Sequence, residues 1–107
     1  YRKDAGSFLG PEAIRSIENV RIETCFIGAT GIAVDGSFST QNLHESEVKR
    51  AVLSVSTRRI ILADSSKIGS TAFAVFAGPD KVDVLITDDG KDQNGMISSL
   101  GIEIVVV

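Results

Sequence analysis

The feature that most constrains the fold is a recurring unit in which an apolar segment ends in small and polar residues. It occurs in residues 24–31, 60–67 and 82–90. Between the first two units, residues 44–57 predict an amphipathic helix, with apolar residues at helical spacing at Val48, Ala51, Val52 and Val55. Strands that alternate with helices form βαβ units with right-handed crossovers, and therefore a parallel sheet. The sequence predicts an α/β domain.

Weaker signals complete the predicted order of elements. Helices are expected at residues 11–19 and about 92–100, and strands at residues 22–27, 60–63, 82–87 and 102–107. Pro11 suits the first turn of the first helix, and Gly101 would end the second. Residues 28–43 are interpreted as rich in loop, and the short apolar stretch 72–76 receives no element.

Composition bounds the class of protein. The chain has 107 residues, 43% of them hydrophobic, which suffices for one buried core. Its net charge is −3 and no basic face is evident, so we do not expect this chain alone to bind DNA or an anionic membrane. The single cysteine, Cys25, fits a reducing cytoplasm and lies in an apolar strand as a small buried hydrophobe.

The two ends of the chain favour a fragment. The chain opens without a methionine, and residues 102–107 have the pattern of a strand that is still in progress. A buried strand needs neighbours on both sides. We therefore expect a piece of a longer protein, truncated at its N-terminus.

Polar groups gather where the predicted strands end, and ligands of parallel sheets bind outside the carboxyl ends of the strands. Residues 28–31 (Gly-Ala-Thr-Gly) could cradle an anion, although a tight turn explains them equally well. Residues 64–67 (Asp-Ser-Ser-Lys) suit a phosphate, and the alternative is a cap or turn built on Asp64. With free backbone N–H groups, these loops favour a phosphate or a polyol as ligand.

Other charged residues have simple structural explanations. Glu45 and Lys49 are four residues apart, so an ordinary surface ion pair is the simpler interpretation of that pair. His44 is the only histidine, and with one distant cysteine it does not make a metal site. Residues 88–90 (Asp-Asp-Gly) could bind a cation or a sugar hydroxyl, but a turn is favoured. No metal and no cofactor is expected.

Five short motifs follow one another in a characteristic order. They are residues 26–32 (FIGATGI), Ser39 with Thr40, residues 45–51 (ESEVKRA), residues 62–69 (LADSSKIG) and residues 83–88 (DVLITD). Together they resemble the C-terminal effector domain of DeoR-family transcriptional repressors. Arg2 and residues 7–11 are similar to the stretch just upstream in that family, so the resemblance covers nearly the whole chain.

The resemblance implies a Rossmann-like, three-layer parallel sheet of the ribose-5-phosphate isomerase and CoA-transferase type. It implies one domain, residues 1–107, that senses a phosphorylated sugar or related metabolite in the cytoplasm. DNA would be bound through a helix-turn-helix outside this chain, and members of the family are typically homo-oligomers. The positions that match the ligand-facing motifs are Gly28, Thr30, Gly31, Glu47, Lys49, Asp64, Ser66 and Lys67.

The chain departs from the family pattern at two points. The hydroxyl-glycine-threonine loop that grips phosphate in the family does not occur in these residues. The isomerase relatives have a carboxylate-rich loop where this chain has Ile27 and Thr30, so a proton shuttle would retain only Glu47. Sensing without turnover is therefore preferred over a sugar-phosphate isomerase fragment. The retained residues 64–67 argue against a third possibility, a dimerisation module with a vestigial pocket.

Overall fold

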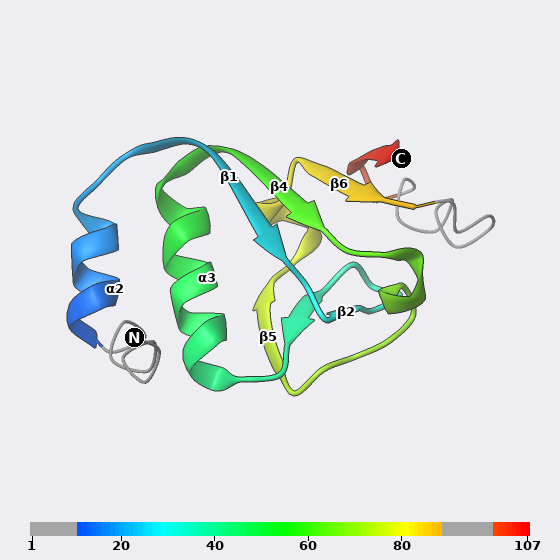
Figure 1. Cartoon of the computed structure of the whole chain (residues 1–107), viewed down its shortest axis with the longest axis horizontal. Coiled ribbons are helices and arrows are strands. Elements are labelled where there is room, and N and C mark those ends of the chain that lie inside the picture. Colours follow the sequence, from blue (N-terminus) through cyan, green and yellow to red (C-terminus); the bar gives the residue numbers. More distant parts are fainter. Residues whose placement is uncertain (1–10, 89–99) are drawn as a thin grey trace.

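Four parallel strands form the main sheet within residues 11–88 and 100–107, which the computed structural model describes. They are β1 (Ile22–Gly28), β4 (Ser56–Leu62), β6 (Val84–Thr87) and β7 (Glu103–Val106). Their order is β1-β4-β6-β7, and every neighbouring pair is parallel (Figure 1). The predicted α/β class and parallel sheet are thereby confirmed.

The junction between the long helix and β4 differs from the sequence prediction. Helix α3 spans Leu43–Val55 and β4 follows at once, whereas the helix was predicted to residue 57 and the strand from residue 60. Ser56 ends the helix because its backbone N–H donates to the Leu53 carbonyl and its hydroxyl donates to the Val52 carbonyl. The polar first half of β4 pairs with β1 without deep burial, so it carries no apolar strand pattern.

A second, antiparallel sheet lies at the carboxyl side of the parallel strands (Figure 1). It comprises β2 (Gly31–Ile32), β3 (Phe38–Thr40) and β5 (Ala74–Ala77), in the order β2-β3-β5. The loop-rich segment 28–43 therefore also contains two short strands, β2 and β3, that the sequence did not predict. Strands this short cannot establish an alternating pattern, and β3 is buried at every position, so a search for period two could not find them.

Helix α3 lies beside the strands, and α2 (Pro11–Glu18) packs along the far side of α3 (Figure 1). Asn42 caps α3, because its side-chain oxygen accepts a hydrogen bond from the Glu45 N–H at 3.1 Å. The predicted helix at residues 92–100 falls outside the described residues except for its last position. No helix in the described part of the chain is long and apolar enough to cross a membrane.

The hydrophobic core lies between one face of the parallel sheet and a layer made by α3 and the antiparallel sheet. The sheet face contributes Cys25, Ile27, Ile61 and Leu85, and the opposite layer contributes Leu53, Ile32, Phe38 and Phe76. Cys25 is buried, as predicted. This packing places α3 against β1 and β4 of the parallel sheet and against β3 and β5 of the antiparallel sheet.

Candidate functional site

The carboxyl ends of three parallel strands meet at one edge of the sheet. Gly28 of β1 is in register with Leu62 of β4, and Leu62 is in register with Ile86 of β6. The alignment continues one residue further, since the Ala29 N–H donates to the Leu62 carbonyl at 3.3 Å. The Ala63 N–H likewise donates to the Ile86 carbonyl at 3.2 Å. The polar loops selected from the sequence therefore start side by side.

A lysine from α3 reaches the end of β1. The Lys49 ammonium donates to the Gly28 carbonyl at 2.6 Å and lies 3.5 Å from the Thr40 hydroxyl. The Thr40 hydroxyl donates to the Glu45 carboxylate at 2.8 Å, and that carboxylate lies 3.9 Å from Lys49. Lys49 also lies 5.3 Å from the centroid of the Phe76 ring. Gly28, Thr40, Glu45 and Lys49 are called the Lys49 cluster below.

Burial determines the electrostatics of this cluster. The Lys49 side chain is 22% exposed, whereas Glu45 is 48% exposed. Desolvation lowers the pKa of Lys49 below its ordinary value of 10.5, and the nearby charge of Glu45 acts in the opposite direction. The charge of Lys49 is therefore only partly compensated within the cluster, so a bound anion would stabilise the charged ammonium.

The sequence pattern does not mark Thr40 or Glu45 as site residues. The spacing of Glu45 and Lys49 indicated an ordinary surface pair, and the pair does form, but it lies at the sheet edge where ligands of parallel sheets bind. Thr40 belongs to β3, which the sequence pattern did not reveal. The only signal in the sequence was a hydroxyl residue, Thr40, five residues before Glu45. This spacing indicates a contact between the two side chains only if α3 begins after Asn42, which caps it.

Residues 64–67 form a capped turn. The 3₁₀ turn η1 (Ser65–Lys67) has Asp64 as its N-cap, and the Asp64 carboxylate accepts from both the backbone N–H and the hydroxyl of Ser66. The Lys67 N–H donates to the Asp64 carbonyl at 3.0 Å, and the Ser65 N–H donates to the Asp88 carboxylate at 2.8 Å. The expectation of free backbone N–H groups in this turn is therefore wrong, and only its side chains could hold an anion.

Two carboxylates lie on this side of the sheet edge. The hydrogen bonds from Ser65 lower the pKa of Asp88, so Asp88 is charged at neutral pH. Asp64, the cap of the turn, supplies the second carboxylate. The half-buried Lys67 therefore supplies one positive charge beside the two negative charges of Asp64 and Asp88. Thr87, just before Asp88, is 2% exposed, and its hydroxyl has no partner among the described residues. The turn alone is thus a weaker anion site than its sequence indicated.

Gly31 is the first residue of β2 in the antiparallel sheet, and Thr30 directly precedes it. The Thr30 N–H donates to the Ser39 carbonyl at 2.9 Å, and the Ser39 hydroxyl donates to the Gly31 carbonyl at 3.3 Å. A Cβ at position 31 would lie 2.8 Å from the Ser39 hydroxyl and 2.9 Å from the Ala72 nitrogen, so packing requires glycine there. A Cβ at Gly28 would meet only the Leu62 carbonyl, at 3.9 Å, so the space beside Gly28 is open among the described residues.

Glu47 lies on another surface of α3. It lines a groove with Ile14 and Glu18 of α2, whereas Lys49 extends to the end of β1. His44 is exposed, and no group of three or more potential metal ligands occurs in the part of the chain described here. The positions predicted from the sequence thus occupy four places. These are Gly28 with Lys49, the turn of Asp64, Ser66 and Lys67, the start of β2 with Thr30 and Gly31, and the groove with Glu47.

Known proteins of similar sequence are transcriptional regulators. The chain is 27% identical to the HTH-type transcriptional regulator GlpR of Haloferax volcanii over 97% of its length. It is 34% identical to the transcriptional repressor AccR of Agrobacterium fabrum over 84%, and 30% identical to the glycerol-3-phosphate regulon repressor of Haemophilus influenzae over 78%. These matches cover 42%, 35% and 33% of the relatives, so the chain spans less than half of their length.

A family profile agrees with the motifs in the sequence. The profile described as the DeoR C terminal sensor domain matches residues 1–89. This range contains the Lys49 cluster and the turn of residues 64–67, so both parts of the sheet edge fall within the match. The chain therefore belongs to the DeoR C-terminal sensor domain family.

Proposed function

We propose that this chain is the effector-sensing part of a cytoplasmic DeoR-family transcriptional repressor, and that its effector is a phosphorylated sugar or a related small metabolite. Binding of the effector changes the affinity of the full-length protein for operator DNA, which a helix-turn-helix reads. Family membership and the regulatory names of the relatives support this role. A relative that is a glycerol-3-phosphate regulon repressor supports a phosphorylated metabolite as the ligand class.

The observation that carries the proposal is the Lys49 cluster at the carboxyl end of β1. Its partly buried ammonium suits a phosphate oxygen, and charge-assisted hydrogen bonds of this kind are the strong ones. The exposed Glu45 carboxylate suits sugar hydroxyls, and the buried Thr40 hydroxyl donates to it and orients it. The open space beside Gly28 leaves room for the ligand. Lys67, Asp64 and Ser66 form the outer part of the same site.

The same cluster supports binding without turnover. Isomerisation of an aldose phosphate needs a positioned base and groups that stabilise the enediolate oxygens. Ile27 is 7% exposed in the core, and Glu47 lies in the groove beside α2. Glu45 is the carboxylate of the Lys49 cluster, and it already accepts a hydrogen bond from the Thr40 hydroxyl beside Lys49. A sensor that consumed its ligand would also erase the signal that it reports.

Two further properties are proposed from the family. The complete domain has the three-layer fold of ribose-5-phosphate isomerase and the CoA transferases, and it forms a homo-oligomer. In support, β1 is an edge strand of the described sheet and its outer face carries Phe26, which is 60% exposed. An edge strand of seven residues invites pairing with further chain. Light scattering of the full-length protein would measure the oligomeric state.

Calorimetry with a panel of aldose and ketose phosphates tests the proposed ligand class. The unphosphorylated sugars and inorganic phosphate serve as reference ligands. We expect saturable binding of at least one sugar phosphate, and weaker or no binding of the matching sugar. Lys67→Ala should weaken binding, and an unchanged affinity would remove Lys67 from the site. If no sugar phosphate binds the full-length protein, the proposed ligand class is wrong.

The enzyme alternative has its own test. The full-length protein is incubated with ribose 5-phosphate and hexose phosphates, and the substrates are followed by NMR. We expect no consumption of substrate. Consumption that scales with protein and disappears in Glu45→Gln would establish catalysis and overturn the sensing proposal. Glu47→Gln is the matched control, because it removes a carboxylate two residues away that does not reach the Lys49 cluster.

A further inference from the structure

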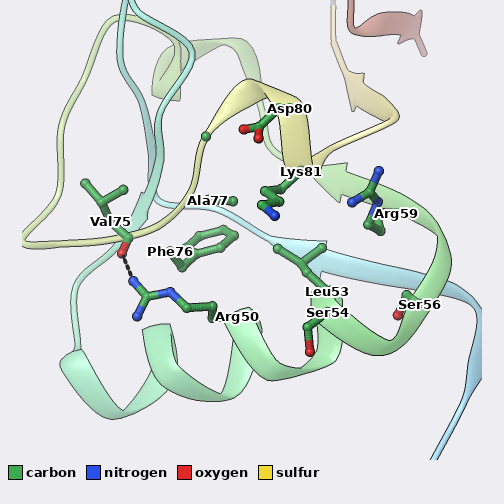
Figure 2. A pocket seen from close by; sticks show the side chains of 11 residues that line it. Arg50, Leu53, Ser54, Ser56, Arg59, Val75, Phe76, Ala77, Asp80 and Lys81 are labelled. Carbon is green, nitrogen blue, oxygen red and sulfur yellow. Dashed lines mark hydrogen bonds between the residues drawn. The ribbon is translucent and has the colours of Figure 1, made fainter. Parts of the chain in front are cut away.

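A cavity separate from the strand ends lies between α3, β5 and the 3₁₀ turn η2 (Pro79–Lys81). It has a volume of about 540 Å³ and reaches the start of β4 at Ser56. This size lies in the range that small-molecule sites occupy, roughly 300–1,000 Å³. Figure 2 shows side chains from α3, β4, β5 and η2 around the cavity. None of the eight positions selected from the sequence lines it.

The wall of the cavity is positively charged, although the chain as a whole has a net charge of −3. Three cations, Arg50, Arg59 and Lys81, line it against one carboxylate, Asp80. Arg59 is already paired, since its guanidinium lies 3.2 Å from the Asp83 carboxylate. Arg50 and Lys81 therefore remain against the single carboxylate of Asp80. The cavity wall has a net positive charge, although the chain is acidic.

Arg50 and Lys81 are the cations available to a ligand. Arg50 donates one hydrogen bond to the Val75 carbonyl at 2.7 Å, which orients its guanidinium at the edge of β5. A guanidinium has five N–H donors, so four remain. Neither Arg50 nor Lys81 has a carboxylate within 4.0 Å among the described residues. In the view of Figure 2 the Phe76 ring lies between these two side chains.

The floor of the cavity is apolar. Leu53, Phe76 and Ala77 line it, and all three belong to the buried core. Such a surface accepts the apolar body of a ligand, while exposed cations at the mouth accept its charge. The Phe76 ring also lies 5.3 Å from the Lys49 ammonium, so it borders both the cavity and the strand-end site. The cations of the two sites are different residues, since Lys49 does not line the cavity.

We propose that this cavity is a second binding site, for a small organic anion in which a carboxylate or phosphate is attached to an apolar body. The anionic group binds Arg50 and Lys81, and the body packs on Phe76 and Leu53. This second site is separate from the proposed effector site, because none of the cations that line the cavity belongs to the strand ends.

Backbone-amide NMR titration with benzoate and phenyl phosphate tests this site. Benzyl alcohol provides the apolar body without charge, and inorganic phosphate provides the charge without the body. We expect saturable shifts in residues 53–59 and 75–81 with at least one of the two aromatic anions, and little change with either reference compound. Shifts confined to residues 28–31 and 64–67 would assign the anion to the strand ends and overturn the proposal.

Substitutions identify the cations. Arg50→Gln and Lys81→Gln should each weaken binding of the aromatic anion about tenfold, the usual scale for a charge-assisted contact. Lys67→Gln removes the same charge at the strand ends and should leave this affinity unchanged. Arg50→Gln also breaks the contact with Val75, so Lys81→Gln provides the variant without that structural change. Unchanged affinity in both variants, or equal binding of benzyl alcohol, would contradict the proposed site.

Discussion

The Lys49 ammonium lies 2.6 Å from the Gly28 carbonyl oxygen, and this contact joins α3 to the carboxyl end of β1. The two residues are 21 positions apart in the chain. The contact places a partly buried positive charge at the sheet edge where parallel α/β proteins bind ligands. The acceptor in this contact is a backbone carbonyl, which remains when the side chain of residue 28 changes. Substitution of Lys49 therefore tests the role of the charge more directly than substitution of Gly28.

Lys49→Met should reduce sugar-phosphate affinity about tenfold or more, because it removes a charge-assisted hydrogen bond and keeps the apolar stem. The free energy of unfolding at neutral pH should change by less than about 1 kcal/mol, since burial disfavours the ammonium that is lost. Calorimetry and urea unfolding measure the two quantities. Unchanged affinity in a folded variant would remove Lys49 from the site.

The same lysine predicts a pH dependence. Since the folded-state pKa of Lys49 lies below 10.5, the unfolded chain binds more protons between the two values. Stability relative to Lys49→Met should therefore rise with pH through that window. Affinity for a sugar phosphate should fall in the same window, because Lys49 loses its charge. Titration of both proteins in the alkaline range, up to 10.5, compares the two trends.

Gly31→Ala and Gly28→Ala form a matched pair. At position 31 the added methyl would lie 2.8–2.9 Å from Ser39, Ala72 and Ser70, and we expect a loss of about 1–3 kcal/mol in unfolding free energy. At position 28 the nearest atom is 3.9 Å away, so stability should change by less than about 0.5 kcal/mol. Gly28→Ala should instead weaken sugar-phosphate binding. Equal destabilisation by the two substitutions would contradict this difference in packing.

Asn42→Ala should destabilise the domain by about 1 kcal/mol, because the Glu45 N–H loses its capping acceptor. For a domain of this size that corresponds to a fall in melting temperature of about 4–8 °C. Asn42→Asp keeps an acceptor oxygen and should retain most of the stability. A melting temperature for Asn42→Ala equal to that of the unsubstituted protein would show that the cap is energetically unimportant.

Asp83 predicts an acid-dependent loss of stability. The hydrogen bond from Arg59 lowers the pKa of Asp83, so its contribution is present above 3.8 and is lost as the pH falls through the folded-state pKa. Because the pair is partly exposed, Asp83→Asn should cost only about 0.5–1 kcal/mol at neutral pH. Urea unfolding should show this difference shrinking below pH 3.8. A difference that persists at low pH would mean that the charge of Asp83 is not its source.

Asp83→Ala separates the backbone contact from the ion pair. The Asp83 carboxylate also accepts the Arg59 backbone N–H at 2.8 Å, which asparagine can still accept and alanine cannot. The alanine variant should therefore be less stable than the asparagine variant by about 1 kcal/mol at neutral pH. Equal stability of the two variants would show that the backbone contact contributes little.

The sequence by itself determined the local properties of this domain. Helical spacing from Val48 to Val55 predicted α3, the apolar segments predicted the parallel strands, and the motif order predicted the family that the profile then matched. Each of these signals lies within a few neighbouring residues, so the pattern remains readable before the chain folds. Asp64 likewise forms its cap with Ser66, two positions away, one of the alternatives that the local sequence allowed.

The tertiary structure alone decided how these parts combine. The short strands β2, β3 and β5 form by pairing with one another, and β5 is distant in sequence from β3, as the pair of Ser39 and Val75 shows. That pairing brings Thr40 beside Glu45 and Lys49, while Glu47, only two residues from Lys49, lies beside α2. Successive helical positions point about 100° apart, so neighbours in sequence serve different surfaces. Which surface becomes a site depends on the elements that pack against it, and that information is not local.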